Sequence, residues 1–297
     1  MRNSNIIIAG RKLKMENHIE NKGEAEDFLE KWKKDLKAIE QDLSGLFIVR
    51  SAFEKLRKVV LAVKDISPKD EAFVSSFKVF ADLVLQGYVA FIVMGIRRHM
   101  KPNKDERKFK YERRFKSISL VGLLEGISKH PEYISKSYFI SLYHCEDIEP
   151  EGSMVNEEDL SDEEKKAIDD RAKVKARKIC KEGAEGKWKK LSGDCEFLPP
   201  EVVEKDIKEL KECVEDIEDF ADKYIAHLDR KRKPSKLTLN KIANSLSKIE
   251  ELYKKCSELL TGSFPSSLEP VSQFSDKKFF DEFEKWLVKK FSKETTE

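Results

Sequence analysis

Apolar residues recur at steps of three and four along most of the chain, the spacing that places side chains on one face of an α-helix. The first such stripe lies within residues 24–63 and comprises Phe28, Trp32, Leu36, Ile39, Leu43 and Phe47. We predict one helix here, with a bend or an interruption near residues 44–45, where a serine precedes a glycine.

A second helix is predicted over about residues 70–100. Residues 67–70 have the sequence of a helix cap, with Pro68 at the first helical position. Residues 83–96 carry no charge, but this run of about 14 residues is shorter than the ~20 that span a bilayer. We therefore predict a helix buried on all sides and no membrane partner.

Further helices follow from the same spacing in the second half of the chain. A polar helix opens at a Ser161–Glu164 capping box and is predicted to end near residue 181. Pro200 begins a strongly amphipathic helix, and a turn at residues 230–234 leads into another that ends before Gly262. A last helix with an aromatic face is expected over residues 276–291.

These patterns predict an all-α fold, an up-and-down helical bundle, because short connections make neighbouring helices antiparallel. We divide the chain into a flexible N-terminus (1–22), the N-terminal helices of the bundle (23–145), an acidic linker with a polar helical insertion (146–198) and the C-terminal helices (199–297). With only 12 glycines and 9 prolines, the composition also favours helices.

Charge is nearly balanced overall, at +2, but it is unevenly distributed along the chain. Residues 97–116 contain ten Lys or Arg against three acids, and residues 223–241 seven against one. Residues 146–170 contain twelve acids against two lysines. Such blocks suit either contacts with partners of opposite charge or solvated surface.

The five cysteines form no CxxC pair, which argues against a zinc site and against a disulfide scaffold. Free thiols suit a reducing compartment, so we expect a cytoplasmic protein. The sequence has no phosphate-binding loop, no GxGxxG, no HExxH and no GxSxG. We therefore predict no metal and no cofactor.

One segment suggests chemistry: FADKYIAHLD at residues 220–229, followed directly by the cations of residues 230–233. The imidazole of His227 can exchange a proton near neutral pH, and neighbouring cations can hold a phosphodiester. The structural alternative is that His227 interacts with the helix C-terminus and the cations form a solvated turn. His99 and His144 are expected to be partly exposed helix-end residues, and the three tryptophans to be packing groups.

The same segment, together with IEELYKKCSELLTG, resembles the helical hairpin of the HEPN superfamily, in the prokaryotic branch related to abortive-infection (Abi) proteins. The stretches VAFIVMGIRRH, SISLVGLLEGISKHPEYIS and FFDEFEKWL agree with it. The resemblance implies an all-α, often dimeric protein from a superfamily of metal-independent endoribonucleases. In these, a histidine acts as acid and base on the 2′-hydroxyl, and an arginine four to six residues earlier stabilises the phosphorane charge.

Here Phe220, Ala221 and Asp222 stand where that arginine is expected, and Lys223 is the nearest cation. Arg97 or Arg98 could take its place in space. The predicted catalytic residues are His227, Asp222 and Lys223, and the predicted RNA-binding residues are Arg97, Arg98, Arg113, Arg114, Arg230 and Arg232.

Three functions are open at this stage. The first is an RNA-directed defence or toxin protein, an endoribonuclease acting at a homodimer interface. The second is a catalytically inactive scaffold of a defence or regulatory system, which binds a protein partner. The third is an enzyme that acts on a nucleotide or small molecule in a pocket between helices. No motif in the sequence supports this third function.

Overall fold

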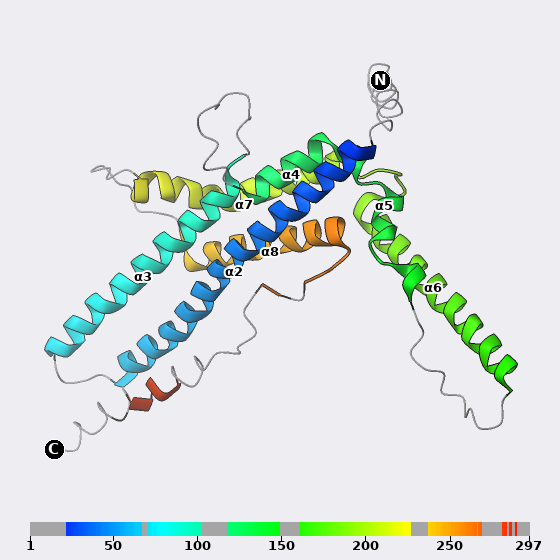
Figure 1. Ribbon diagram of the computed structural model, residues 1–297. Helices are drawn as coiled ribbons and strands as arrows, with labels where there is room; N and C mark the ends of the chain where they lie inside the picture. The colour runs from blue at the N-terminus through cyan, green and yellow to red at the C-terminus, as the bar shows by residue number, and fades with distance from the viewer. Residues whose placement is uncertain are drawn as a thin grey trace, which may run out of the picture. The chain divides into compact units, whose positions relative to one another are not determined.

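The computed structural model describes residues 22–66, 71–102, 118–148, 161–226, 237–265 and 267–268, with 281–283, 285–286 and 289 near the C-terminus. These residues contain no strand, and they confirm the predicted all-α class. The elements (Figure 1) are α2 (Lys22–Ile66), α3 (Glu71–Met100), α4 (Leu120–Lys129), η1 (Pro131–Tyr133), α5 (Lys136–Ser141), η2 (Cys145–Asp147), α6 (Asp162–Ser192), α7 (Pro200–Phe220), the π-helical η4 (Ala221–Ala226) and α8 (Leu239–Thr261).

The chain forms two compact units, each made of segments that are distant in sequence. Unit 1 comprises Met1–Leu36, Leu123–Ile207 and Lys254–Phe264, and unit 2 comprises Lys37–Gly122, Lys208–Tyr253 and Pro265–Glu297. The helices α2, α7 and α8 each contribute residues to both units. The four-part division predicted from sequence remains a prediction.

In unit 2, α2 and α3 are antiparallel neighbours. The Phe53 ring stacks on Tyr88 with centroids 3.8 Å apart. Nearer the other end, Leu46 fills the space that a Cβ on Gly95 would occupy, which is why a glycine stands there. Of the predicted bend or interruption, the interruption is absent, because α2 continues through residues 44–45. The buried Leu43, Leu46 and Phe47 hold the helix on both sides of the glycine, so packing outweighs its low helix propensity.

Helix α3 is not buried on all sides, so that prediction is wrong. Ile92, Val93 and Ile96 are fully buried, whereas Leu83 and Phe91 are more than half exposed. By length and composition alone, Ser75–Met100 would also qualify as a membrane-spanning helix among the described residues. The absence of charge shows only that burial of residues 83–96 is favourable. Among the described residues, only one face of α3 is actually buried.

In unit 1, α6 packs on α5 and η2. Its N-terminus has the predicted capping box: the Glu164 N–H donates to Ser161 Oγ, and the Ser161 N–H donates to the Glu164 carboxylate. The helix runs to Ser192, well past the predicted end. Two side chains beyond that point, Ala184 and Trp188, are buried and hold the last turns in place.

A disulfide joins Cys145 of η2 to Cys180 of α6, so the expectation of free thiols throughout is wrong for this pair. The packing of η2 on α6 brings together two cysteines 35 residues apart, which no local motif could signal. Cys195, Cys213 and Cys256 are free. Burial raises the pKa of the Cys256 thiol to about 12, so this thiol is unreactive at neutral pH.

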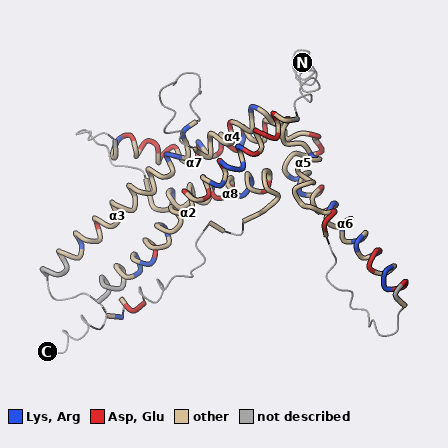
Figure 2. Tube along the Cα trace, in the orientation of Figure 1, with Lys and Arg blue, Asp and Glu red and all other residues tan. Residues whose placement is uncertain are grey.

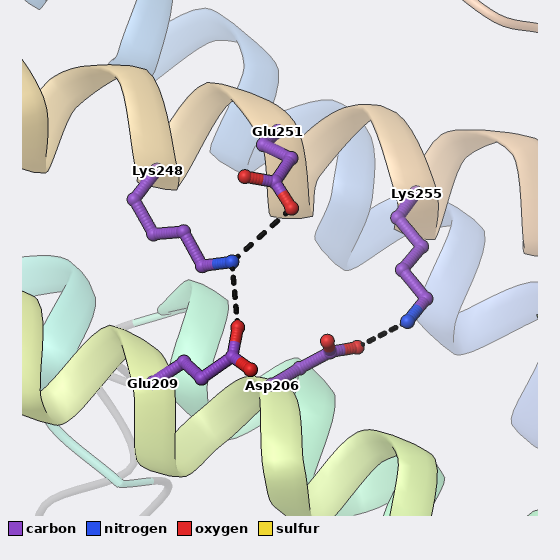
Figure 3. A network of polar contacts seen from close by, with 5 residues as sticks. All are labelled: Asp206, Glu209, Lys248, Glu251 and Lys255. Carbon is purple, nitrogen blue, oxygen red and sulfur yellow. Dashed lines mark hydrogen bonds and ion pairs between the residues drawn. The ribbon is translucent and has the colours of Figure 1, made fainter.

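In unit 2, the ion pairs Lys241–Asp216 and Lys248–Glu209 show that α7 and α8 are antiparallel, and Figure 3 draws the second of them. In unit 1, Lys255 Nζ lies 2.6 Å from Asp206; in unit 2, Lys248 Nζ lies 2.9 Å from Glu209 and 3.1 Å from Glu251. Burial would lower the pKa of Lys248, but hydrogen bonds to the two carboxylates raise it. The predicted turn at residues 230–234 lies outside the described residues.

Candidate functional site

Charged side chains gather at the C-terminal end of α3, in unit 2. Arg97, Arg98 and His99 occupy its last turn, where cations interact favourably with the helix dipole. Asp42 of α2 and Asp222 of η4 face them. We call these five residues the α3-end cluster.

Arg97 forms an ion pair with Asp222, with Nη2 2.5 Å from Oδ1. The pair ties the end of α3 to the π-helical segment η4, and the two elements pack on each other. His227 is the residue directly after η4 in the sequence. The structure thus brings two predicted site residues, 125 positions apart, into contact.

Arg98 and His99 share a second carboxylate, Asp42. Arg98 donates a hydrogen bond to Oδ1, and His99 Nε2 lies 3.0 Å from Oδ2. The His99 side chain is fully buried, so the prediction that it is partly exposed is wrong. His99 follows Tyr88, Ile92 and Ile96 on the face of α3 that packs inward.

The His99 ring is held close to a charge without a well-aligned hydrogen bond. Its Nε2 is near Asp42, but neither ring nitrogen has a hydrogen-bond partner among the described residues in good geometry. Burial would raise the pKa of Asp42, but His99 and Arg98 outweigh burial and hold it below its ordinary value of 3.8. Asp42 is therefore the anion that fixes this end of α3.

We expect the substitution Asp42→Asn to lower the free energy of unfolding by about 1–2 kcal/mol at pH 7, because it removes the charged acceptor of the Arg98 hydrogen bond and the negative charge beside His99. The pKa of Asp42 is lower in the folded state, so the wild type has this stabilisation above pH 3.8 and loses it as pH falls through the folded pKa. Urea unfolding at pH 7 and pH 3 measures both effects.

Asp219→Asn is the matched control for that experiment. Asp219 pairs with Lys223 one helical turn away, and both side chains are more than half exposed. An exposed pair of this kind contributes only about 0.3–0.5 kcal/mol. Equal losses in the two variants would contradict the assigned role of Asp42.

A shallow surface hollow of about 390 Å³ adjoins the cluster, lined by Ala38, Gln41, Asp42, Arg98 and Ile118. Half of the Arg98 side chain is exposed there. A guanidinium at the rim of an open hollow can contact a phosphate group without leaving Asp42, because its five N–H donors point in several directions.

The remaining predicted site residues fall into two groups. Lys223 pairs with Asp219 at 2.5 Å, and the hydrogen bond to Asp219 raises the pKa of Lys223. His227, Arg113, Arg114, Arg230 and Arg232 lie outside the described residues. Within the described ranges there is also no group of three or more His, Cys, Asp or Glu placed to hold a metal ion.

The tryptophans and histidines outside the α3-end cluster either make packing contacts or are exposed to solvent. Trp32 and Trp188 are buried, as packing groups should be, whereas Trp286 is exposed. His144 is largely exposed and has a left-handed backbone. His130 stacks on Tyr133.

Sequence reasoning missed Asp42 and the burial of His99. Asp42 lies 56 residues before Arg98 on a helix rich in charge, so no spacing distinguishes it from its neighbours. Comparison of the chain with protein-family models, curated proteins and solved structures finds no match. Any function proposed for this chain is therefore based on the contacts within the α3-end cluster.

Proposed function

We propose that this chain is an HEPN-like, RNA-directed protein whose RNA site lies at the α3-end cluster and the segment after η4. The observation that carries this proposal is the Arg97–Asp222 ion pair, which holds the basic last turn of α3 against η4. His227 follows η4 immediately in the sequence. A histidine and an arginine near one phosphodiester are the groups that metal-independent cleavage needs.

In this proposal His227 takes the proton from the ribose 2′-hydroxyl as that oxygen attacks phosphorus. The bond from phosphorus to the 5′-oxygen breaks, the protonated imidazole gives its proton to that departing oxygen, and a 2′,3′-cyclic phosphate remains. Arg97 supplies the positive charge for the phosphorane, in place of the arginine missing from the helix before His227. Asp222 orients Arg97 through the ion pair. Lys223, Arg98 and the cations Arg113, Arg114, Arg230 and Arg232 hold the backbone phosphates. A ribonuclease of this kind suits a defence or toxin role.

A second candidate, a catalytically inactive scaffold, is favoured by a specific observation. Arg97 and Arg98 each already pair with a carboxylate, Asp222 and Asp42 respectively. An arginine neutralised within the fold contributes less to RNA affinity than an unpaired one. If neither arginine contacts RNA in addition to its carboxylate, the cluster only holds α3 against its neighbours and the protein acts through a protein partner.

The decisive test is incubation of the full chain with total RNA in EDTA. We expect cleavage by the wild type and a loss of at least ~100-fold in rate for His227→Ala, the scale expected for a general acid–base group. His144→Asn is the matched control: that histidine is exposed, and asparagine tolerates its left-handed backbone. This variant should cleave like the wild type.

A binding measurement separates the two candidates when no cleavage is seen. Fluorescence anisotropy with a labelled single-stranded RNA at two salt concentrations reports phosphate contacts, since such contacts make affinity fall with salt. Binding that weakens in Arg97→Gln would retain the RNA site without the chemistry. Absence of both cleavage and binding would sink the RNA proposal and leave the scaffold candidate.

A further inference from the structure

The Cys145–Cys180 disulfide joins η2 to the first part of α6, where neither segment has much buried surface. Of residues 144–147, only Cys145 is buried. Among the described side chains of α6, none before Ala184 is buried, so Cys180 belongs to a partly or fully exposed stretch. Figure 2 shows groups of Lys and Arg alternating with groups of Asp and Glu along this stretch, as on a solvated helix. The bond therefore links two segments whose other described side chains are at least partly exposed.

The other contacts divide into a weak one near the bond and a strong one away from it. Arg177 of α6 lies 3.8 Å from Glu146 of η2, but the two side chains are 45% and 86% exposed. An ion pair so exposed contributes little to stability. Further along α6, the Trp188 ring packs against Phe139 of α5, and both are fully buried. The packing of α5 on α6 is thus independent of the disulfide, whereas that of η2 depends on it.

The backbone just before Cys145 has an unfavourable conformation. His144 has φ 47° and ψ 39°, and among the described residues it is the only one other than glycine with a positive φ. This left-handed region is costly for a residue with a Cβ, which keeps it only where surrounding contacts enforce it. The His144 side chain is exposed, and so is Asp147, its partner at 3.6 Å. The buried, bridged Cys145 is therefore the residue that holds this backbone in place.

We propose that Cys145 and Cys180 form a reversible thiol–disulfide switch, opened by a dithiol reductant, that controls the docking of η2 on α6. In the oxidised chain η2 is held on α6. In the reduced chain residues 144–147 leave α6 and the backbone of His144 relaxes, while α5 and the end of α6 stay packed. The proposal rests on these contacts and not on RNA chemistry.

Exchange begins at Cys180, because this residue is partly exposed whereas Cys145 is buried. A thiolate of the reductant attacks Cys180 Sγ, the bond between the two cysteine sulfurs breaks, and Cys145 leaves as a thiolate that takes a proton from water. The second thiolate of the reductant then displaces Cys180 from the mixed disulfide, and Cys180 is protonated in turn. The chain gains two electrons and two protons, and the dithiol becomes a cyclic disulfide.

The groups around Cys180 suit both states of the switch. Arg177 stands three residues before it and Lys181 directly after it, and positive charge favours the approach of a thiolate. Cys180 Sγ lies 3.9 Å from the Tyr143 carbonyl oxygen, which can accept a hydrogen bond from the thiol after reduction. The Cα atoms of the two cysteines are 5.6 Å apart, within the usual range for a bridge, so oxidation closes the bond without further backbone movement once η2 has docked.

Cleavage by a glutamate-specific serine protease tests the release of η2. The full chain carries Cys195→Ser, which removes the exposed free thiol, and is compared after treatment with oxidised and with reduced dithiothreitol. We expect cleavage after Glu146 to be about tenfold or more faster in the reduced chain, because local release exposes the backbone. Cleavage after Glu196, an exposed residue in the loop that follows α6, is the internal reference and should keep its rate.

The double variant Cys145→Ser/Cys180→Ser in the same background should be cleaved after Glu146 at the fast rate with or without dithiothreitol. Re-oxidation of the reduced chain should restore the slow rate, and circular dichroism should show equal helix content in both states. A rate at Glu146 that does not respond to reduction overturns the proposal. Equal acceleration at Glu146 and Glu196 with loss of helix also overturns it, because the bond then holds the whole of unit 1.

Two variants of His144 test whether its backbone relaxes on reduction. Glycine adopts the left-handed conformation without the cost of a Cβ, so His144→Gly should favour the docked, oxidised state, whereas His144→Ala keeps the cost. Part of the gain is offset by the freedom of a released glycine, so we expect the ratio of reduced to oxidised dithiothreitol at half reduction to be about threefold higher for His144→Gly. Alkylation followed by mass spectrometry measures the reduced fraction. Equal ratios in the two variants, or an oxidised chain without the 145–180 bond, would contradict the switch.

Discussion

Replacing Trp188 with alanine is expected to lower the free energy of unfolding by about 4 kcal/mol, the scale seen when a buried aromatic is removed from a packed core. Trp188 is one of the largest fully buried side chains in the described structure. Its ring packs against Phe139 of α5, with centroids 5.3 Å apart. Its indole N–H donates to the Cys195 carbonyl at 2.8 Å.

Two variants separate these contributions. Trp188→Phe keeps most of the packing but removes the hydrogen bond to the carbonyl of the exposed Cys195, which should cost about 0.5–1.5 kcal/mol. Trp286→Ala, at a side chain that is 53% exposed, should change stability far less. Urea unfolding followed by circular dichroism measures all three. A Trp188→Ala loss no larger than that of Trp286→Ala would mean that α6 is not docked on α5 in solution.

Periodicity predicts the helices of this chain well because helix formation is local. The stripe from Trp32 to Phe47 is buried on one face of α2, as predicted. Pro200 begins α7, and the Ser161–Glu164 capping box opens α6. Each of these signals lies within a few residues of the feature it predicts, so one sequence suffices to find it.

Features that depend on distant segments could not be predicted in the same way. The hydropathy of residues 83–96 shows that burial of α3 is favourable. How much of its surface is buried depends on which other segments pack against it. The same holds for His99, because a histidine at a helix end is buried or exposed according to what packs beside it. Here Asp42 of α2 stands next to it.

Some residues of the candidate site could be predicted from sequence, but the contacts between them could not. Arg97 and Arg98 are conspicuous as cations that end an apolar helix, and Asp222 as a residue near His227. That Arg97 meets Asp222 required the three-dimensional structure, because no sequence pattern links α3 to η4. The roles of His227 and of the arginines outside the described residues remain predictions.

The second large effect is expected on loss of the Cys145–Cys180 disulfide. The bond closes a loop across a sequence separation of 35 residues, and the chain-entropy model gives about 4 kcal/mol for a loop of this length. The double variant Cys145→Ser/Cys180→Ser should therefore unfold at much lower urea concentration than the oxidised wild type. Reduction of the wild type with dithiothreitol should give a similar loss.

The redox state of this pair also tests the expected compartment, since cytoplasmic thiols are normally kept reduced. Dithiothreitol should leave the double variant unchanged, because Cys195, Cys213 and Cys256 are free thiols already. Mass spectrometry of the purified chain before and after alkylation counts the thiols in each state. If reduction leaves wild-type stability unchanged, the docking of η2 on α6 holds unit 1 without the bond.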